Sequence, residues 1–209
     1  EGARARVIAI DYRLAPEHKF PAAHDDALAA WNWVTTHADA CGVDPNRLAV
    51  CGDSAGGNLA AVGALALRDT KEPELCFQLL VYPVTDYRCA SASYEAYATG
   101  YGVLEAQTMR WFQGHYLDEL IDQSDWRASP LLAETKAGLP PALVITAECD
   151  VLHDEGVAYA KALADEGTEV SHVDYAGMIH GFFGLAPMIS GAVQAQTSAT
   201  QALRKAFAA

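Results

Sequence analysis

The residues of this chain best suited to covalent chemistry form a G-x-S-x-G pentapeptide centred on Ser54. A short apolar run at 48–51 precedes it, and a longer apolar run at 58–67 follows it. A serine on a tight turn between a strand and a helix has its hydroxyl exposed as a nucleophile. Gly52 and Gly56 flank the serine where we expect a Cβ atom to crowd a sharply folded backbone. The pattern therefore predicts nucleophilic catalysis by Ser54.

This strand–turn–helix arrangement around Ser54, called a nucleophile elbow, also predicts where a negatively charged oxygen would bind. A helix that begins just after the serine directs unpaired N–H groups and the positive end of its dipole toward it. The N–H of Ala55 is the donor expected to bind a developing oxyanion. Asp53 and Gly57 complete the elbow.

A serine nucleophile needs a base, and the base needs a carboxylate that orients it. Asp150 follows an apolar run that ends at residue 147, and His180 follows the next run along the chain. Because open α/β sheets place functional groups at the carboxyl ends of their strands, we expect both side chains at one sheet edge. Glu148 and Asp154 are alternative acids, and His153 is an alternative base.

Apolar runs that alternate with helical patterns indicate an α/β fold with a mostly parallel sheet flanked by helices. The predicted strands are 7–12, 48–51, 77–82, 142–147 and 169–175. The predicted helices are 22–38, one that includes 58–67, 154–166 and 189–207. The aromatic-rich stretch 85–138 interrupts this rhythm and is predicted to form a helical cap above the strand ends. We expect most of its aromatic side chains to pack internally and only one or two to line a pocket.

Composition narrows the functional classes. A chain of 209 residues fits one domain, 1–209, and its net charge of −13 argues against nucleic acid and anionic membranes as partners. Its apolar runs are too short to span a membrane. Five cysteines without a C-x-x-C pair are typical of a reducing compartment, so the predicted location is the cytoplasm. The sequence has no H-E-x-x-H motif or clustered metal-ligand spacing, so no metal or cofactor is predicted.

Four sequence blocks resemble the hormone-sensitive-lipase-like esterases, whose bacterial branch is called family IV carboxylesterases. The blocks are 11–17 with 20–23, 52–58, 150–156 and 180–182. The resemblance implies an α/β-hydrolase fold with Ser54 as nucleophile, Asp150 as acid and His180 as base. In the acid block, Val151, Leu152 and His153 stand where the family usually has proline, leucine and arginine.

The family carries an upstream His-Gly-Gly-Gly block that supplies most of the oxyanion hole, and this sequence has no such block. The resemblance therefore predicts a partial catalytic domain that lacks the first strands, the oxyanion loop and part of the cap. It also predicts little esterase activity and poor solubility for these 209 residues alone, because sheet edges and the oxyanion would lose their partners.

The predicted function is hydrolysis of short-acyl esters of small molecules through an acyl-serine intermediate. One alternative is a non-catalytic small-ligand receptor on the same fold, which the presence of His180 disfavours. Another is hydrolysis of amides, carbamates or lactones, which the same three residues could perform. The resemblance further implies a homodimer that pairs through the last strand, around 170–175.

Overall fold

The computed structural model describes residues 2–68, 74–118 and 123–208. Within these residues, a four-stranded sheet has the order β1-β2-β3-β4, and every neighbouring pair is parallel. The strands are β1 (Leu48–Asp53), β2 (Leu75–Val81), β3 (Ala142–Cys149) and β4 (Val170–Ile179). Because all four run the same way, their carboxyl ends lie along one edge of the sheet.

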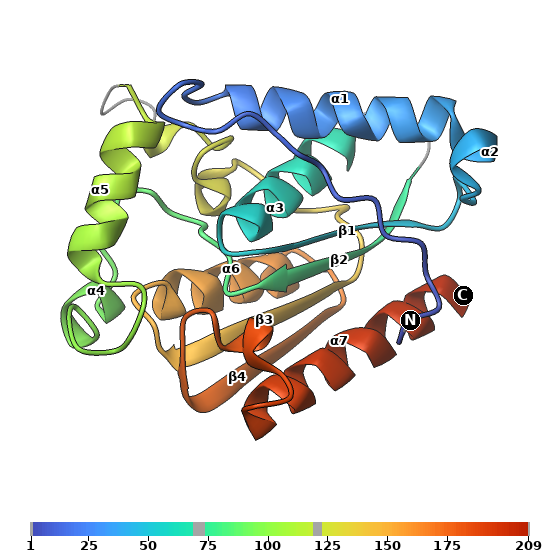
Figure 1. Ribbon diagram of the computed structural model, residues 1–209. Helices are drawn as coiled ribbons and strands as arrows, with labels where there is room; N and C mark the ends of the chain where they lie inside the picture. Colours follow the sequence, from blue (N-terminus) through green and yellow to red (C-terminus); the bar gives the residue numbers. More distant parts are fainter. Residues whose placement is uncertain (1, 69–73, 119–122, 209) are drawn as a thin grey trace.

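Helices cover both faces of this sheet (Figure 1). The α-helices are α1 (Ala22–Thr36), α2 (Ala38–Cys41), α3 (Ala55–Arg68), α4 (Ser93–Ala96), α5 (Ala106–Tyr116), α6 (His153–Asp165) and α7 (Ser190–Ala208). The 3-10 helices η2 and η3 comprise Pro130–Leu132 and Phe182–Leu185. Helices α3 and α6 pack on one face and α7 packs on the other.

The two-residue period of the strands explains these layers. Leu79 of β2 and Ile145 of β3 pack in the cluster that includes α7. Their neighbours Leu80 and Val144 point to the opposite face and pack with side chains of α3 and α6. A sheet buried on both faces needs apolar residues in succession, which is the pattern that the sequence shows for β2 and β3.

The strand predicted at 7–12 is wrong. These residues belong to no strand, and the segment passes across β1 on its way to α1 (Figure 1). Val7 is 86% exposed and Ile10 is 43% exposed. An apolar run becomes a strand only when it exchanges backbone hydrogen bonds with another strand, and no strand among the described residues pairs with this segment.

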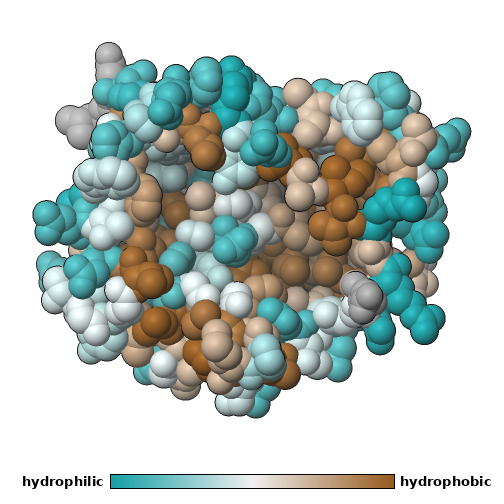
Figure 2. Space-filling model, viewed as in Figure 1, coloured by the Kyte–Doolittle hydropathy of each residue, from teal (hydrophilic) through white to brown (hydrophobic). Residues whose placement is uncertain are grey.

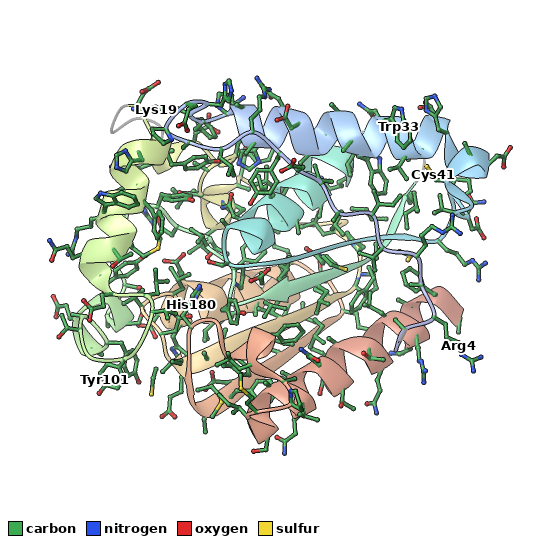
Figure 3. The ribbon with its side chains drawn as sticks, viewed as in Figure 1. Arg4, Lys19, Trp33, Cys41, Tyr101 and His180 are labelled. Atoms are coloured by element: carbon green, nitrogen blue, oxygen red, sulfur yellow. The ribbon has the colours of Figure 1, made fainter. Side chains whose placement is uncertain are left out.

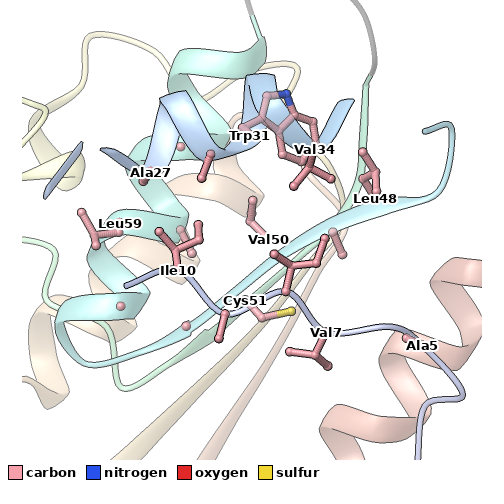
Figure 4. A pocket seen from close by; sticks show the side chains of 18 of the residues that line it. Ala5, Val7, Ile10, Ala27, Trp31, Val34, Leu48, Val50, Cys51 and Leu59 are labelled. Atoms are coloured by element: carbon pink, nitrogen blue, oxygen red, sulfur yellow. The ribbon is translucent and has the colours of Figure 1, made fainter. Parts of the chain in front are cut away.

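An apolar groove of about 870 Å³ instead separates this segment from β1, α1 and α3. Figure 4 shows Val7 and Ile10 on one side of the groove, with Trp31, Val34 and Val50 across from them. Figure 2 shows apolar side chains over this hollowed part of the molecular face.

The other predicted elements are confirmed with shifted bounds. Strands β1 to β4 match the runs at 48–51, 77–82, 142–147 and 169–175. The helix predicted at 22–38 breaks at His37 and resumes as α2, which ends before Gly42 at φ +60°. Helices α3, α6 and α7 are where they are expected, and Gly167 follows α6 with φ +91°.

The stretch 85–138 carries α4, α5 and η2, and its residues 119–122 lie outside the described residues. Tyr87 and Tyr94 are buried in an apolar cluster, as expected for packed aromatic side chains. Trp111 and Tyr101 are instead 60% and 40% exposed. The role of this stretch as a substrate cap stays a prediction.

Two structural features are absent from the described ranges. No helix there combines the length and the apolar character needed to cross a bilayer. The same residues contain no group of three or more histidine, cysteine, aspartate or glutamate side chains arranged to hold a metal ion.

Candidate active site

Ser54 lies on the turn between β1 and α3 in a left-handed backbone conformation, with φ +55°. Few non-glycine residues adopt this region, and those that do are often held there at functional sites. Its N–H donates to the carbonyl of Val81 at 2.9 Å, and its carbonyl accepts from the N–H of Val84 at 3.2 Å. The segment that follows β2 therefore holds the turn on both sides of the serine.

The glycines of the elbow have different roles. A Cβ atom on Gly52 would lie 2.1 Å from the carbonyl oxygen of Gly56, so the expected crowding there is confirmed. A Cβ atom on Gly56 would meet nothing within 4 Å among the described residues, so the crowding expected there is wrong. The second close approach is at Gly57, whose added Cβ would lie 2.9 Å from that of Pro83. Gly56 and Gly57 both lie in α3, and of the two only Gly57 would have a Cβ atom that meets Pro83.

Sheet register brings the key residues together. Asp53 of β1 pairs with Val81 of β2, so the next residue of each strand, Ser54 and Tyr82, leave the sheet side by side. In the same way, Cys149 of β3 pairs with Ile179 of β4, and Asp150 and His180 follow them. Residues far apart in the chain thus meet at the carboxyl ends of the strands.

The side chains of Ser54, His180 and Asp150 form a continuous hydrogen-bonded series. Nε2 of His180 lies 2.9 Å from Oγ of Ser54, and Nδ1 of His180 lies 2.6 Å from Oδ2 of Asp150. The side chain of His180 is 10% exposed and that of Asp150 is 0% exposed. Figure 3 shows His180 on the side of the sheet where Tyr101 lies. The structure therefore brings together all three side chains that the sequence singled out.

The carboxylate of Asp150 is fixed through both oxygens. Oδ2 faces His180, while Oδ1 accepts a hydrogen bond from the N–H of Leu152 at 3.0 Å. A buried carboxylate is costly unless hydrogen bonds compensate for its lost hydration. This arrangement suits an acid that orients a histidine ring.

The alternative acids and the alternative base have other partners. Oε2 of Glu148 accepts from the N–H of Gly177 at 2.7 Å. Asp154 pairs with Nδ1 of His153 at 2.8 Å, and Nε2 of His153 lies 3.4 Å from Asp174. His153 therefore joins Asp154 at the start of α6 to Asp174 of β4.

Tyr82 is a component of the site that sequence reasoning missed. Its ring centroid lies 4.5 Å from that of His180, and its backbone has φ +34°. Burial raises the pKa of the Tyr82 hydroxyl above its ordinary value, and the nearby Asp53 and Asp150 act in the same direction. The Tyr82 side chain is therefore an uncharged aromatic ring that packs beside the imidazole. The available signal was an aromatic residue at a strand end, directly before Pro83.

Ala55 is the first residue of α3, so the helix does not use its N–H in the internal hydrogen-bond ladder. This donor lies next to the serine at the positive end of the helix dipole. It is placed where an oxyanion formed by attack of Ser54 would need hydrogen bonds.

A parallel sheet covered on both faces, with serine, histidine and aspartate joined at its strand ends, defines the class of α/β-hydrolases. A family model described as the alpha/beta hydrolase fold matches residues 1–184, and the chain belongs to this family. The predicted fold class and the resemblance to hormone-sensitive-lipase-like esterases are confirmed by these comparisons.

The chain is 44% identical over 202 residues to an ethyl acetate hydrolase from Pseudomonas putida, a match that covers 95% of this chain and 63% of that protein. It is 43% identical to the carboxylic ester hydrolase LipN from Mycobacterium tuberculosis, covering 95% of this chain and 54% of LipN. Among solved structures, the thermophilic carboxylesterase EstE1 from a metagenomic library superposes with a TM-score of 0.90 at 44% identity, covering 94% of this chain and 67% of that chain. The chain thus spans 63% and 54% of the length of these two curated relatives.

Proposed function

We propose that the protein is a serine carboxylic-ester hydrolase that acts on small esters with short acyl groups. The observation that supports this most strongly is the series of hydrogen bonds from Ser54 through His180 to Asp150, at 2.9 and 2.6 Å. The printed names of the relatives, ethyl acetate hydrolase and carboxylic ester hydrolase, support the same reaction class. Ethyl acetate has a two-carbon acyl group, which is the basis for proposing short acyl chains.

In the proposed mechanism, Nε2 of His180 removes the hydroxyl proton of Ser54 as Oγ attacks the ester carbonyl. Asp150 holds Nδ1–H in place and stabilises the imidazolium that forms. The N–H of Ala55 donates to the oxyanion of the tetrahedral intermediate. His180 then returns the proton to the departing alcohol, leaving an acyl-serine. A water molecule deprotonated by His180 attacks that acyl group, and His180 returns the proton to Oγ of Ser54 as the acyl–oxygen bond breaks and the carboxylic acid is released.

The proposal also covers the location of the protein and its assembly into a dimer. A reducing, cytoplasmic location is supported by the five cysteines, all of which are free thiols. Pairing of two copies through β4 is supported by the position of that strand at one edge of the described sheet.

The test is covalent labelling of the full-length gene product with a serine-directed phosphonate. We expect one phosphonate per chain, located by mass spectrometry on Ser54, together with loss of turnover on a short-chain ester. Ser54→Ala should abolish both labelling and turnover, while the control Ser198→Ala, on the outer helix α7, should retain both. A protein that binds small ligands but shows neither labelling nor turnover would be a receptor. Faster turnover of a matched amide than of the ester would instead indicate an amidase.

A further inference from the structure

The segment 81–86, which begins at the last residue of β2, determines the conformation of the nucleophile turn. Val81 accepts the N–H of Ser54 and Val84 donates to its carbonyl, at 2.9 and 3.2 Å. Because Ser54 has φ +55°, the backbone conformation depends on contacts made from outside the turn. A displacement of this segment would therefore displace Oγ of the serine.

The same segment contacts the histidine. Tyr82 places its ring 4.5 Å from the ring of His180, and its own N–H donates to the carbonyl of Ile145 at 2.6 Å. The segment thus touches two of the three groups of the hydrogen-bonded series, one through backbone atoms and the other through an aromatic ring.

One buried side chain of α6 binds this segment. Oε1 of Glu155 accepts from the N–H of Thr85 at 2.7 Å and from the N–H of Asp86 at 3.1 Å. The backbone carbonyl of Glu155 also accepts from the hydroxyl of Thr85 at 2.8 Å. Glu155 is therefore the point at which α6 and the segment 81–86 are joined.

A carboxyl group in this position is costly and needs an explanation. Glu155 is 3% exposed, and glutamate is rarely buried unless it is paired. Burial raises the pKa of the Glu155 carboxyl well above its ordinary value, while the N–H donors of Thr85 and Asp86 act in the opposite direction. An apolar side chain would fill the space but could accept neither N–H.

We propose that Glu155 is a positioning residue that holds the segment 81–86 and thereby sets the geometry between Ser54 and His180. Helix α6 begins three residues after Asp150, so one short stretch of chain carries both the acid and the residue that fixes the nucleophile turn. The proposal rests on the proposed function, because its consequence is measured on the hydrolytic site.

The experiment compares Glu155→Ala, Glu155→Gln and Leu163→Ala in the full-length gene product. Leu163 is a fully buried residue of the same helix that packs in the core around α3, away from the segment. We expect Glu155→Ala to lower kcat and the rate of phosphonate labelling by about 10²-fold, because a misplacement of about 1 Å has that effect, with little change in KM. Glu155→Gln keeps Oε1 as an acceptor and should recover at least roughly tenfold of that loss. Leu163→Ala should lower Tm by roughly 5–15 °C and leave kcat within about twofold well below Tm.

Glu155→Asp is the second variant if Glu155→Ala does not fold. It keeps the carboxyl group but is one methylene shorter, and a kcat at least about tenfold lower is expected because it cannot reach both N–H groups. Equal kcat in the Glu155→Ala and Leu163→Ala variants, an unchanged kcat in Glu155→Asp, or no recovery in Glu155→Gln would overturn the proposal. An unmodified protein in which Ser54 is not labelled would instead refute the proposed function, so the two failures are distinguishable.

Discussion

Nδ1 of His180 lies 2.6 Å from Oδ2 of Asp150, and the two side chains are 10% and 0% exposed. The carboxylate has a second hydrogen bond, from the N–H of Leu152, which fixes its orientation toward the ring. Water therefore has little access to the bond that sets the tautomer of the histidine.

Asp150→Asn should lower kcat on a short-chain ester by about 10⁴-fold, because an amide that donates to Nδ1 stabilises the wrong tautomer of His180. Steady-state kinetics of the full-length gene product measure this effect. Asp154→Asn is the matched control, since Asp154 contacts His153 and not His180. The assignment of the acid is wrong if Asp150→Asn keeps near-normal turnover while Asp154→Asn loses it.

Gly52→Ala should damage the nucleophile turn, because the added Cβ would lie 2.1 Å from the carbonyl oxygen of Gly56 and the backbone must move. We expect a loss of about 1–3 kcal/mol in the free energy of unfolding, measured by urea denaturation, and a kcat lowered by more than about 10²-fold.

Gly114→Ala is the control for this substitution. Gly114 lies within α5, and an added Cβ there meets nothing within 4 Å of the described residues. Replacing a helical glycine by alanine should raise the free energy of unfolding by about 0.5–1 kcal/mol and leave kcat unchanged. Two variants with the same change in stability would show that Gly52 has no special steric role.

His24 should make stability depend on pH. Burial, with a smaller effect from Arg127, lowers the pKa of His24 from 6.5 to about 4, and its side chain is nearly inaccessible to solvent. Between those pH values the unfolded chain binds a proton that the folded protein does not bind. The free energy of unfolding therefore falls as pH decreases from about 6.5 to about 4, by about 3 kcal/mol in total from this group.

His24→Gln should remove this contribution, since glutamine does not titrate. Urea denaturation at pH 7 and pH 4.5 measures the difference, and comparing the variant with the unmodified protein at each pH cancels the effect of the carboxylates. A variant that loses as much stability on acidification as the unmodified protein would contradict the prediction.

Asn58→Leu should destabilise the protein by removing two buried hydrogen bonds. The side chain is 2% exposed, and its Nδ2 donates to the carbonyls of Val84 at 2.8 Å and Ala128 at 2.7 Å. Leucine has the same number of side-chain heavy atoms and the same branching but leaves both buried carbonyls without that donor, which costs about 2–4 kcal/mol. The midpoint of urea denaturation measures this loss. A change smaller than about 0.5 kcal/mol would show that other donors replace the amide.

Much of the fold could be predicted because the signals are local. The apolar runs of β2 and β3 identify buried parallel strands, and the G-x-S-x-G turn identifies the elbow at Ser54. Asp150 and His180 could be selected because each follows a strand, and parallel strands end at a common edge. These inferences need only the order of residues along the chain.

Other features could not be predicted because they depend on what lies beside a segment in space. Residues 7–12 have the pattern of a strand, yet they pair with no strand among the described residues. Gly56 and Gly57 are indistinguishable in sequence, but only Gly57 approaches Pro83. The contact of Tyr82 with His180 and that of Glu155 with Thr85 join parts of the chain that no spacing rule connects.

The sequence by itself determined the order of elements, the serine on its turn, and which acid and base follow strand ends, because short-range patterns encode backbone conformation. Only the tertiary structure decided the atomic distances from Ser54 to His180 and from His180 to Asp150. It alone also revealed the buried carboxylate of Glu155 behind the turn. The physical reason is that hydrogen bonds act over about 3 Å, so partners 30 or 126 positions apart are selected by strand register and packing rather than by local sequence.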